Sequence, residues 1–179
     1  ASARVAHYRF TPTQKSEYIY CVIDLAHRDQ VLDHDINVID EQNINGKRIS
    51  KSWAQQQHIY FHLSSDQSMS YVKQDENGQK MVLRMKYAPE IQIKIALSPV
   101  SEHNAKLNME KEVPHFNWSQ TLAENQKAWE KELQRIEFHG TPEQDTIFYT
   151  ALYHNFIVPN LFQDVNGDYR GTDLKVHHD

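Results

Sequence analysis

The segment Asp164–Asp173 is the part of this sequence that most resembles a metal site. Oxygen side chains stand at its first, third and fifth positions, as they do in the calcium loop of an EF-hand. However, Tyr169 occupies the sixth position, where that loop needs Gly, and Lys175 occupies the twelfth, where it needs a bidentate Glu. The pair Asn166-Gly167 is instead typical of a type I′ hairpin turn. The segment therefore predicts a turn, and no metal ligand is assigned in it.

The eleven histidines do not form a zinc motif. On a strand, His58 and His62 would share a face about 13 Å apart, too far for one zinc ion. His177 and His178 are adjacent, so on a strand they would point to opposite faces. The sequence therefore predicts solvated or hydrogen-bonded histidines. Cys21 is the one cysteine, which excludes an internal disulfide, and its apolar surroundings predict a buried, inert thiol.

No motif identifies a catalytic nucleophile or a phosphate loop, because neither GxSxG nor a glycine-rich loop occurs. Glycosyl transfer would need two carboxyl groups about 5–10 Å apart. Six carboxylates in the C-terminal third are available, but their spacing selects no pair: Glu143, Asp145, Asp164, Asp168, Asp173 and Asp179. Glu143 and Asp145 already have a role as first-turn charges of a helix. No catalytic residue is assigned.

Among the tryptophans, Trp118 and Trp129 have helical spacing and are expected in a core. Trp53 lies in a polar stretch and is a candidate platform for a sugar, as is the face that carries Tyr18 and Tyr20. The substrate-binding residues stay unknown at this stage.

Composition excludes several classes of protein. Three Trp, nine Tyr and seven Phe among 179 residues argue against disorder. The net charge of −5 arises in residues 116–179, and no cluster of Lys and Arg is present to bind a nucleic acid. No apolar run is long enough to span a membrane. The first residues have no signal peptide, and whether an export signal precedes Ala1 stays open.

Residues 1–100 have the pattern of strands. The run 91–98 alternates apolar and mainly polar residues, as a half-buried strand does, whereas 17–25 is apolar on both faces and is expected in the centre of a sheet. Residues 58–63 and 81–87 are further strand candidates. Turns are expected at Asn45-Gly46-Lys47, Glu76-Asn77-Gly78 and Ala88-Pro89. Together these predict a β-sandwich.

After Pro99 the pattern becomes helical. Ser101 is expected to cap a helix through Asn108 or Glu110. Asn117, with Gln120 reaching back, begins a second helix that should end at Gly140, and Thr141 begins a third that should run to Pro159. A minimal turn would make these last two helices antiparallel. Their apolar stripes are large for a single pair, so they look like the opening of a larger helical domain.

The sequence resembles family 92 glycoside hydrolases, the calcium-dependent exo-α-mannosidases. The resemblance covers most of the chain, is thinnest in residues 25–45 and 64–80, and is most specific over residues 98–173. It rests on these runs: Asn45–Ser50, Trp53-Ala54, Tyr60-Phe61, Ser98–Asn108, Trp129–Ile136, Phe148–His154, Pro159, Asp164–Gly171 and Asp173.

The resemblance implies a mostly β fold with C-terminal helices, a β-sandwich followed by a linker helix and the start of an (α/α)₆ barrel. Residues 1–100 would be part of the sandwich domain, 101–140 the connecting helices, and 141–179 the incomplete start of the catalytic domain. It also implies inverting hydrolysis of α-1,2-type mannosides, with calcium bound to the sugar. The family's catalytic groups come from segments outside the matched stretch, so neither a catalytic residue nor calcium is expected on this chain.

Three hypotheses follow. The first is a piece of an exo-α-mannosidase that is inactive alone, whose full-length form acts on a mannose-containing glycan in the periplasm or outside the cell. The others are a non-catalytic carbohydrate-binding sandwich and a purely structural module.

Overall fold

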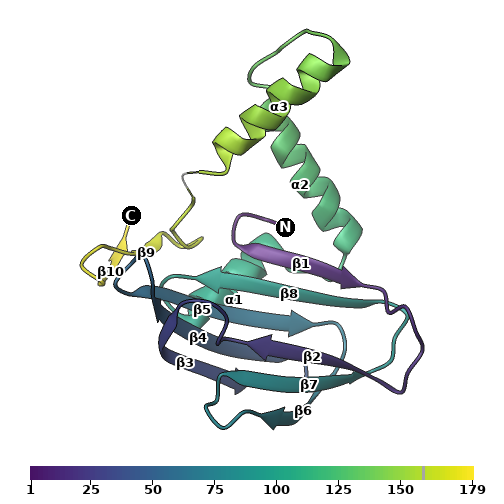
Figure 1. Ribbon diagram of the computed structural model, residues 1–179, viewed down its shortest axis with the longest axis vertical. Helices are drawn as coiled ribbons and strands as arrows, with labels where there is room; N and C mark the ends of the chain where they lie inside the picture. Colours follow the sequence, from purple (N-terminus) through teal and green to yellow (C-terminus); the bar gives the residue numbers. More distant parts are fainter. Residues whose placement is uncertain (159) are drawn as a thin grey trace.

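Two antiparallel sheets face each other and form a β-sandwich in the computed structural model, which describes residues 1–158 and 160–179 (Figure 1). The five-stranded sheet has the order β1 (Val5–Phe10), β8 (Ile91–Ser98), β5 (Gln57–Ser65), β4 (Asn43–Lys51) and β3 (Gln30–Val38). The three-stranded sheet has the order β2 (Tyr18–Asp24), β7 (Lys80–Lys86) and β6 (Met69–Gln74). The predicted fold class is therefore confirmed.

The main core lies between the two sheets. Apolar side chains at alternate strand positions point inward from both sheets, as the period of two requires. The buried members are Ile36, Ile44, Phe61, Leu63, Met69, Met81, Leu83, Met85, Ile91 and Ile93. Cys21 packs against this cluster from β2 and is half-buried, and burial raises the pKa of its thiol. A raised pKa keeps the thiol protonated, in agreement with the predicted inert cysteine.

The prediction that residues 17–25 lie centrally is wrong, because β2 is an edge strand of the smaller sheet. Ile19 and Ile23 face the core, whereas Tyr20 and Val22 on the opposite face are each 59% exposed. Apolar residues on both faces normally indicate a strand that is covered on both sides. Here the outer face has no cover within the described part of the chain.

The turn predicted at Asn45-Gly46-Lys47 is also wrong, since these residues lie in the middle of β4. Gly46 is opposite Phe61 on β5, and a Cβ atom at position 46 would lie 2.4 Å from the Phe61 ring. The glycine therefore provides space for an aromatic ring rather than the freedom to turn. The other two predicted turns lie between strands, and Gly78 has a φ of 72°.

Helix α1 (Glu102–Glu112) covers the outer face of the larger sheet at β8 and β5. It begins as predicted, with the Ser101 hydroxyl accepting from the backbone N–H of Asn104 at 3.1 Å. It ends at Glu112, beyond both expected ends, Asn108 and Glu110. As a result β8 is covered by α1 on its outer face and by the smaller sheet on its inner face, whereas the sequence predicted a half-buried strand. Lys94 on its outer face is 4% exposed, and its ammonium donates to the carbonyl of Val113 at 2.9 Å.

Helix α2 (Trp118–Leu133) begins at the predicted cap, where the side chain of Asn117 accepts from the backbone N–H of Gln120 at 3.1 Å. The side chain of Gln120 does not reach back, because it donates to Glu124 instead. The helix ends at Leu133 and not at Gly140. Residues 134–141 form a longer connection than the predicted minimal turn.

That connection bends back because aromatic rings hold it against α3 (Pro142–Phe156). Phe138 stacks on Phe148 with ring centroids 4.5 Å apart. Helix α3 begins at the predicted Thr141 cap, and the structure shows a full capping box, with Thr141 and Gln144 each satisfying the other's backbone N–H. The helix ends at Phe156, and the expected stop at Pro159 lies outside the described residues.

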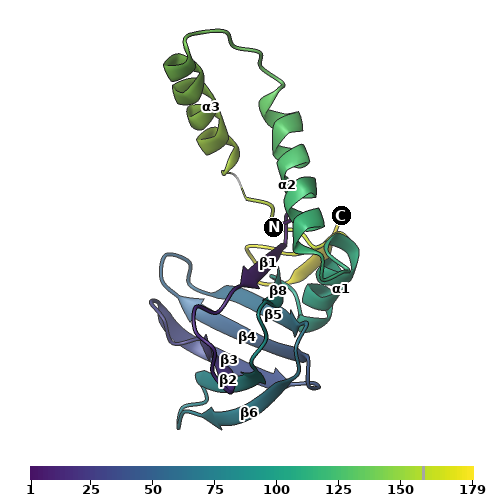
Figure 2. The same cartoon turned by 90° about the vertical axis from the view of Figure 1, so that its right-hand side faces the viewer.

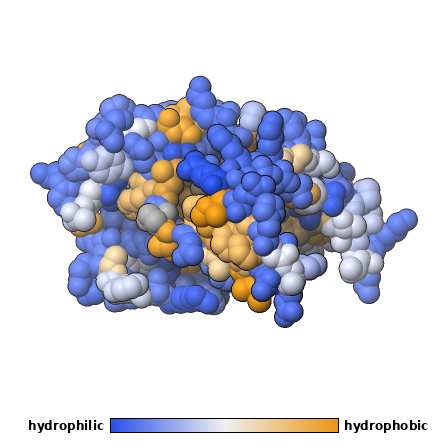
Figure 3. Space-filling model, turned by 90° about the horizontal axis from the view of Figure 1, so that it is seen from above, coloured by the Kyte–Doolittle hydropathy of each residue, from blue (hydrophilic) through white to orange (hydrophobic). Residues whose placement is uncertain are grey.

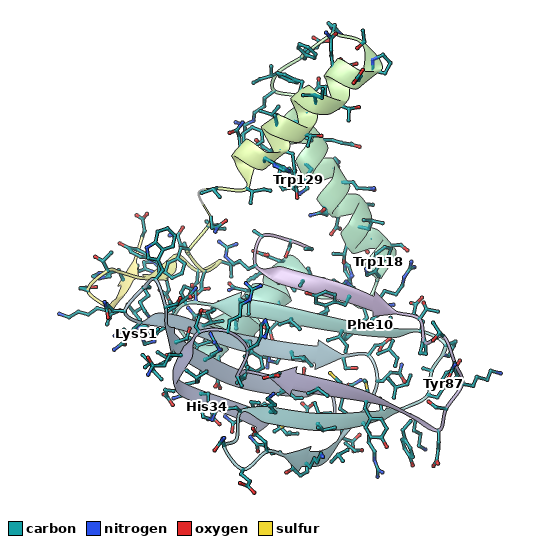
Figure 4. The ribbon with its side chains drawn as sticks, in the orientation of Figure 1. Phe10, His34, Lys51, Tyr87, Trp118 and Trp129 are labelled. Carbon is teal, nitrogen blue, oxygen red and sulfur yellow. The ribbon has the colours of Figure 1, made fainter. Side chains whose placement is uncertain are left out.

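Helices α2 and α3 project from the sandwich as a two-helix arm (Figures 1 and 2). At its base, His7 bonds Thr121 at 2.9 Å and the guanidinium of Arg9 lies 4.0 Å from the centre of the Trp118 ring. Trp118 and Trp129 lie at opposite ends of α2 (Figure 4). Both are half-buried, so the prediction that they belong to a core is wrong for the described chain.

The arm lacks a core of its own: none of the fifteen residues of α3, all of them described, is buried. Its exposed apolar side chains include Leu122, Ile136, Ile147, Tyr153 and Phe156. Figure 3 shows apolar side chains gathered in the middle of the face that the arm occupies. The helices thus carry apolar stripes that this chain does not cover.

The chain returns to the sandwich after the arm and ends in a small hairpin of β9 (Asp168–Arg170) and β10 (Val176–His178). In sequence this hairpin follows α3, but in space it lies beside the end of β8 and the start of α1, as the contacts described below show (Figure 1).

Candidate functional site

Asp164, the first residue of the segment predicted as a turn, is a buried carboxylate that joins three elements. It is 2% exposed. One carboxylate oxygen accepts from the Ser98 hydroxyl at 2.6 Å and from the Asn104 side chain at 3.0 Å. The other accepts from the Asn108 side chain at 2.7 Å. A residue beyond the arm is therefore bonded to the end of β8 and to the first two turns of α1.

The partners of Asp164 are themselves buried and hydrogen-bonded. Ser98, Asn104 and Asn108 are at most 5% exposed. The Asn108 amide also donates to the Leu97 carbonyl at 2.9 Å, and its oxygen accepts from the backbone N–H of Val165 at 3.0 Å. A buried polar network of this kind is favourable only when each member is satisfied, as these members are.

The turn that follows differs in type from the prediction. The backbone N–H of Gly167 donates to the carbonyl of Asp164 at 3.0 Å, and Gly167 has a φ of 91°. Asn166 has no positive φ, whereas a type I′ turn needs one at both central residues. The geometry is that of a turn followed by one left-handed glycine. The turn itself is confirmed and its type I′ assignment is wrong.

The loop does not fit a calcium ion. The oxygens of Asp164 already accept from N–H and O–H donors, which would have to move before a cation could bind. Asp168 accepts from Asn104, Asn166 and His178, and these bonds hold the pKa of its carboxyl below the usual value. Among the residues that the structure describes, no group of three His, Cys, Asp or Glu is placed to hold a metal.

Arg170 fixes the hairpin at its other end. Its guanidinium donates to the carbonyls of Pro99 and Val100 at 2.8 and 3.2 Å, and to that of Leu174 within the hairpin at 2.6 Å. Asp164 and Arg170 thus hold the same short hairpin to the junction of β8 and α1. The sequence alone did not single out Arg170, Asn104 or Asn108 for any role; the spacing of the two asparagines by one helical turn was the available signal.

A groove of about 890 Å³ lies between two segments. Residues 52–57, called loop 52–57, lead from β4 into the first residue of β5, and residues 170–174, called loop 170–174, lead from the last residue of β9 toward β10. Trp53 lines the groove and is 100% exposed. Asp29 is the one carboxylate among the described lining residues, and the other polar ones are Ser52, Gln55, Gln56, Gln57, His58, Arg170 and Thr172. An exposed indole beside several amides offers a flat apolar face and hydrogen-bonding groups, which is the chemistry that a sugar ring requires.

The predicted histidine pairs do not come together on one ligand. His62 is buried and bonds Asn45, while His58 bonds Gln56 at 3.1 Å and its Nδ1 atom is buried without a partner among the described residues. Burial lowers the pKa of both imidazoles. His177 and His178 bond Asp173 and Asp168 at 3.0 and 2.9 Å. The prediction of hydrogen-bonded histidines is confirmed for these four.

The other residues that the sequence offered as candidates either have structural roles or lie away from the Trp53 groove. Glu143 and Asp145 lie in the first turn of α3 as predicted, and Asp145 accepts from the backbone N–H of Gly140 at 2.9 Å. Tyr18 stacks under Arg84 with the guanidinium 4.7 Å from its ring centre, and this face belongs to β2, apart from the Trp53 groove. No helix among the described residues combines the length and hydrophobicity of a membrane span.

Comparison with known proteins relates the chain to one family. Residues 104–179 match the sequence model of the glycosyl hydrolase family 92 catalytic domain. None of the curated proteins matches the chain.

Solved structures of that family have the same fold. A family 92 α-mannosidase from Bacteroides thetaiotaomicron, also solved with mannoimidazole, matches with a TM-score of 0.86 and 23% identity. A second protein from that organism, described as an inverting mannosidase of family 92, matches with a TM-score of 0.82 and 19% identity. The first match covers 100% of this chain and 27% of the related chain; the second covers 99% and 27%.

The resemblance stated from the sequence is therefore confirmed, both by the sequence match that begins in α1 and by the fold match over the sandwich and the arm. Over residues 104–179 this chain matches the catalytic domain of glycosyl hydrolase family 92, and over its whole length it has the fold of solved family 92 mannosidases.

Proposed function

We propose that this chain is the bridging part of an exo-α-mannosidase that inverts the configuration of the sugar, and that it is inactive by itself. The observation that carries the proposal is the family 92 match over residues 104–179, within a chain whose whole fold is that of family 92 mannosidases. The substrate of the whole protein would be an α-linked, 1,2-type mannoside at the end of a glycan, and its site of action the periplasm or the exterior of the cell.

The groove of this chain supports inactivity of the isolated segment. Inverting hydrolysis needs a general acid and a general base about 6.5–9.5 Å apart, with a water molecule between them. Asp29 alone among the described residues brings a carboxylate to the lining of the Trp53 groove. Asp164 has no capacity left for a second task, since all its contacts are hydrogen bonds that fix the fold. The reacting carboxyl groups would come from other segments of the whole protein.

The experiment is to measure mannose release from an α-1,2-linked mannobiose by the 179-residue chain and by a longer protein that continues past Asp179. We expect release by the longer protein alone, and proton NMR should show β-mannose as the first product because the reaction inverts. Release by the short chain would contradict its inactivity. No release by the longer protein would contradict the enzymatic proposal, and α-mannose as the first product would contradict inversion.

Calcium, which the resemblance implies for the whole enzyme, would be bound by residues outside this chain, because the Asp164 loop does not fit it. We expect a chelator to abolish mannose release by the longer protein and calcium to restore it. The same chelator should leave the unfolding temperature of the 179-residue chain unchanged within error. A shift of several degrees would show that this chain binds a structural metal.

A second candidate function is carbohydrate binding without catalysis, which the exposed Trp53 beside the amides of its groove favours. Titration of the chain with mannobiose, followed by tryptophan fluorescence, should then show saturable binding that Trp53→Ala removes. Trp118→Phe is the matched control, because Trp118 packs under Arg9 at the base of the arm. A titration without saturation would exclude this function for the chain.

A further inference from the structure

The C-terminal hairpin is attached to the sandwich almost entirely by polar contacts. Among the described residues 160–179, Asp164 is the one buried side chain. Strand β10 is exposed along its length, and Val176 is 49% exposed. Burial of apolar side chains therefore contributes little to holding this hairpin against the sandwich, and the buried hydrogen bonds must determine its position.

The contacts of Asp164 require a carboxylate and not only a side chain of that size. Both of its oxygens face donors: Ser98 and Asn104 on one side, and Asn108 on the other. An asparagine would have the same shape, but its amide nitrogen would face a donor whichever way it turned. One buried donor would then lose its partner, at a cost of about 1–3 kcal/mol.

The hairpin held in this way forms one wall of the Trp53 groove. Its residues 170–174 lie opposite the loop 52–57, which belongs to the sandwich. Arg170 both lines the groove and bonds the carbonyls of Pro99 and Val100. The place of the hairpin against the sandwich therefore fixes the width of the groove.

We propose that Asp164 is a positioning residue of the Trp53 groove: its buried carboxylate holds loop 170–174 at one distance from loop 52–57. The role of the groove as part of a mannoside site rests on the proposed function, whereas the geometry of the clamp does not. Asp164 touches no substrate and acts through the hairpin. Loss of its carboxylate should therefore broaden the distribution of distances between loop 52–57 and loop 170–174.

The test measures this distance directly. Spin labels at Gln55→Cys and Thr172→Cys, in a Cys21→Ser background, report it by double electron–electron resonance. We expect one narrow distribution with Asp164 and a distribution at least twice as broad in Asp164→Asn. Asp173→Asn is the matched control: it makes the same substitution in the same hairpin, but on a residue whose bonds to His177 and Lys175 are exposed. The control should keep the narrow distribution.

Two further variants separate positioning from general damage. Ser98→Ala removes one donor to Asp164 and should broaden the distance distribution less than Asp164→Asn does. It replaces Asp164→Asn in the test if that variant does not fold. Asn104→Ala removes the second donor to the same carboxylate oxygen and should likewise broaden the distribution. Unchanged widths in both Asp164→Asn and Ser98→Ala would overturn the proposal, as would equal broadening in Asp173→Asn.

In the longer protein, Asp164→Asn should raise the KM for mannobiose at least fivefold and change kcat less than twofold, because the groove binds and the reacting groups lie elsewhere. A fall in kcat at unchanged KM would overturn the proposal. If the longer protein releases no mannose at all, the proposed function fails, and the distance measurement still decides the role of Asp164.

Discussion

At the scale of single residues, several polar or small side chains take their roles from partners far away in the sequence. Phe61 occupies the space that any side chain at position 46 would need, although the two residues lie on different strands. His7, His58 and His62 belong to strands of the larger sheet, and burial lowers the pKa of each imidazole. Each case leads to a measurable consequence.

Gly46→Ala should destabilise the sandwich. The new methyl group would lie 2.4 Å from both the Phe61 ring and the carbonyl oxygen of Asp35, so backbone as well as side chain must move. Overpacking of this kind costs about 1–3 kcal/mol. Urea unfolding followed by circular dichroism should show that loss for Gly46→Ala and almost none for Ser70→Ala, an exposed strand position. Equal stability of the two variants would refute the role assigned to Gly46.

The stability of the sandwich should fall as the pH decreases from 7 toward 5. Burial lowers the pKa of the three imidazoles in the folded chain below the ordinary value of 6.5. Between the lowered pKa and 6.5 the unfolded chain binds more protons than the folded chain, so protonation favours unfolding in this window.

Substitution identifies the source of this pH dependence. His62 is the most buried of the three, at 5% exposure against 7% for His7. His62→Gln should therefore flatten the decrease of unfolding free energy between pH 7 and 5. His139→Gln, which changes an exposed histidine, should leave the slope unaltered. An unchanged slope in His62→Gln would contradict the assignment.

At the scale of elements, local signals decide where helices begin, and tertiary contacts decide what covers them. The capping box at Thr141 begins α3 although the helix buries none of its described residues. A helix without burial depends strongly on its cap, since packing contributes most of the stability of ordinary helices. Local opening of α3 should therefore respond to the cap more than global unfolding does.

Thr141→Ala should speed hydrogen exchange in the first turn of α3. Loss of an N-cap costs about 1 kcal/mol, which corresponds to roughly fivefold faster exchange. Thr146→Ala is the control, because its hydroxyl donates to a carbonyl inside the helix and caps nothing. The unfolding midpoint of the sandwich should not change in either variant. Equal exchange rates for the two variants would contradict the role of the cap.

The sequence predicted the types and most places of the elements, and it failed where distant partners matter. Period and cap residues correctly predicted the strand at 91–98 and the start of each helix, because both signals are local. Gly46 was interpreted as a turn because Phe61 is not adjacent to it in sequence. Tyr20 and Val22 suggested a central strand because the sequence does not show which neighbour is missing. For the same reason Asp164 could be placed in a turn, but its hydrogen bonds could not be predicted. Its partners lie between 56 and 66 positions earlier in the chain.

At the scale of the whole molecule, a well-packed sandwich carries an arm that is not packed. Among the described residues, the contacts of the arm with the rest of the chain include His7 with Thr121, Arg9 with Trp118, and the Asn125 amide, which donates to the Ala1 carbonyl. Beyond the arm, the chain is held to the sandwich through Asp164. The apolar stripes of α2 and α3 would suit the interior of a helical domain to which other segments contribute. The match to the first related mannosidase covers 27% of that protein's chain, so the related chain extends far beyond the matched part.

The exposed stripe should make the isolated chain self-associate. Ile147 is 63% exposed on α3. Ile147→Lys should lower the average mass in sedimentation at high concentration, because it places a charge in the apolar stripe. The control Gln126→Lys adds a charge to α2 at an exposed polar position and should not lower it. A chain that stays monomeric at all concentrations would show that the apolar stripe does not cause self-association.

On this proposal, segments outside this chain complete the arm. Hydrogen exchange of the α3 amides, measured in the 179-residue chain and in the longer protein, provides the test. We expect α3 to exchange rapidly in the short chain and at least a hundredfold more slowly in the longer protein, while the amides of β5 and β8 stay protected in both. Equal protection of α3 in the two proteins would show that no outside segment covers the arm.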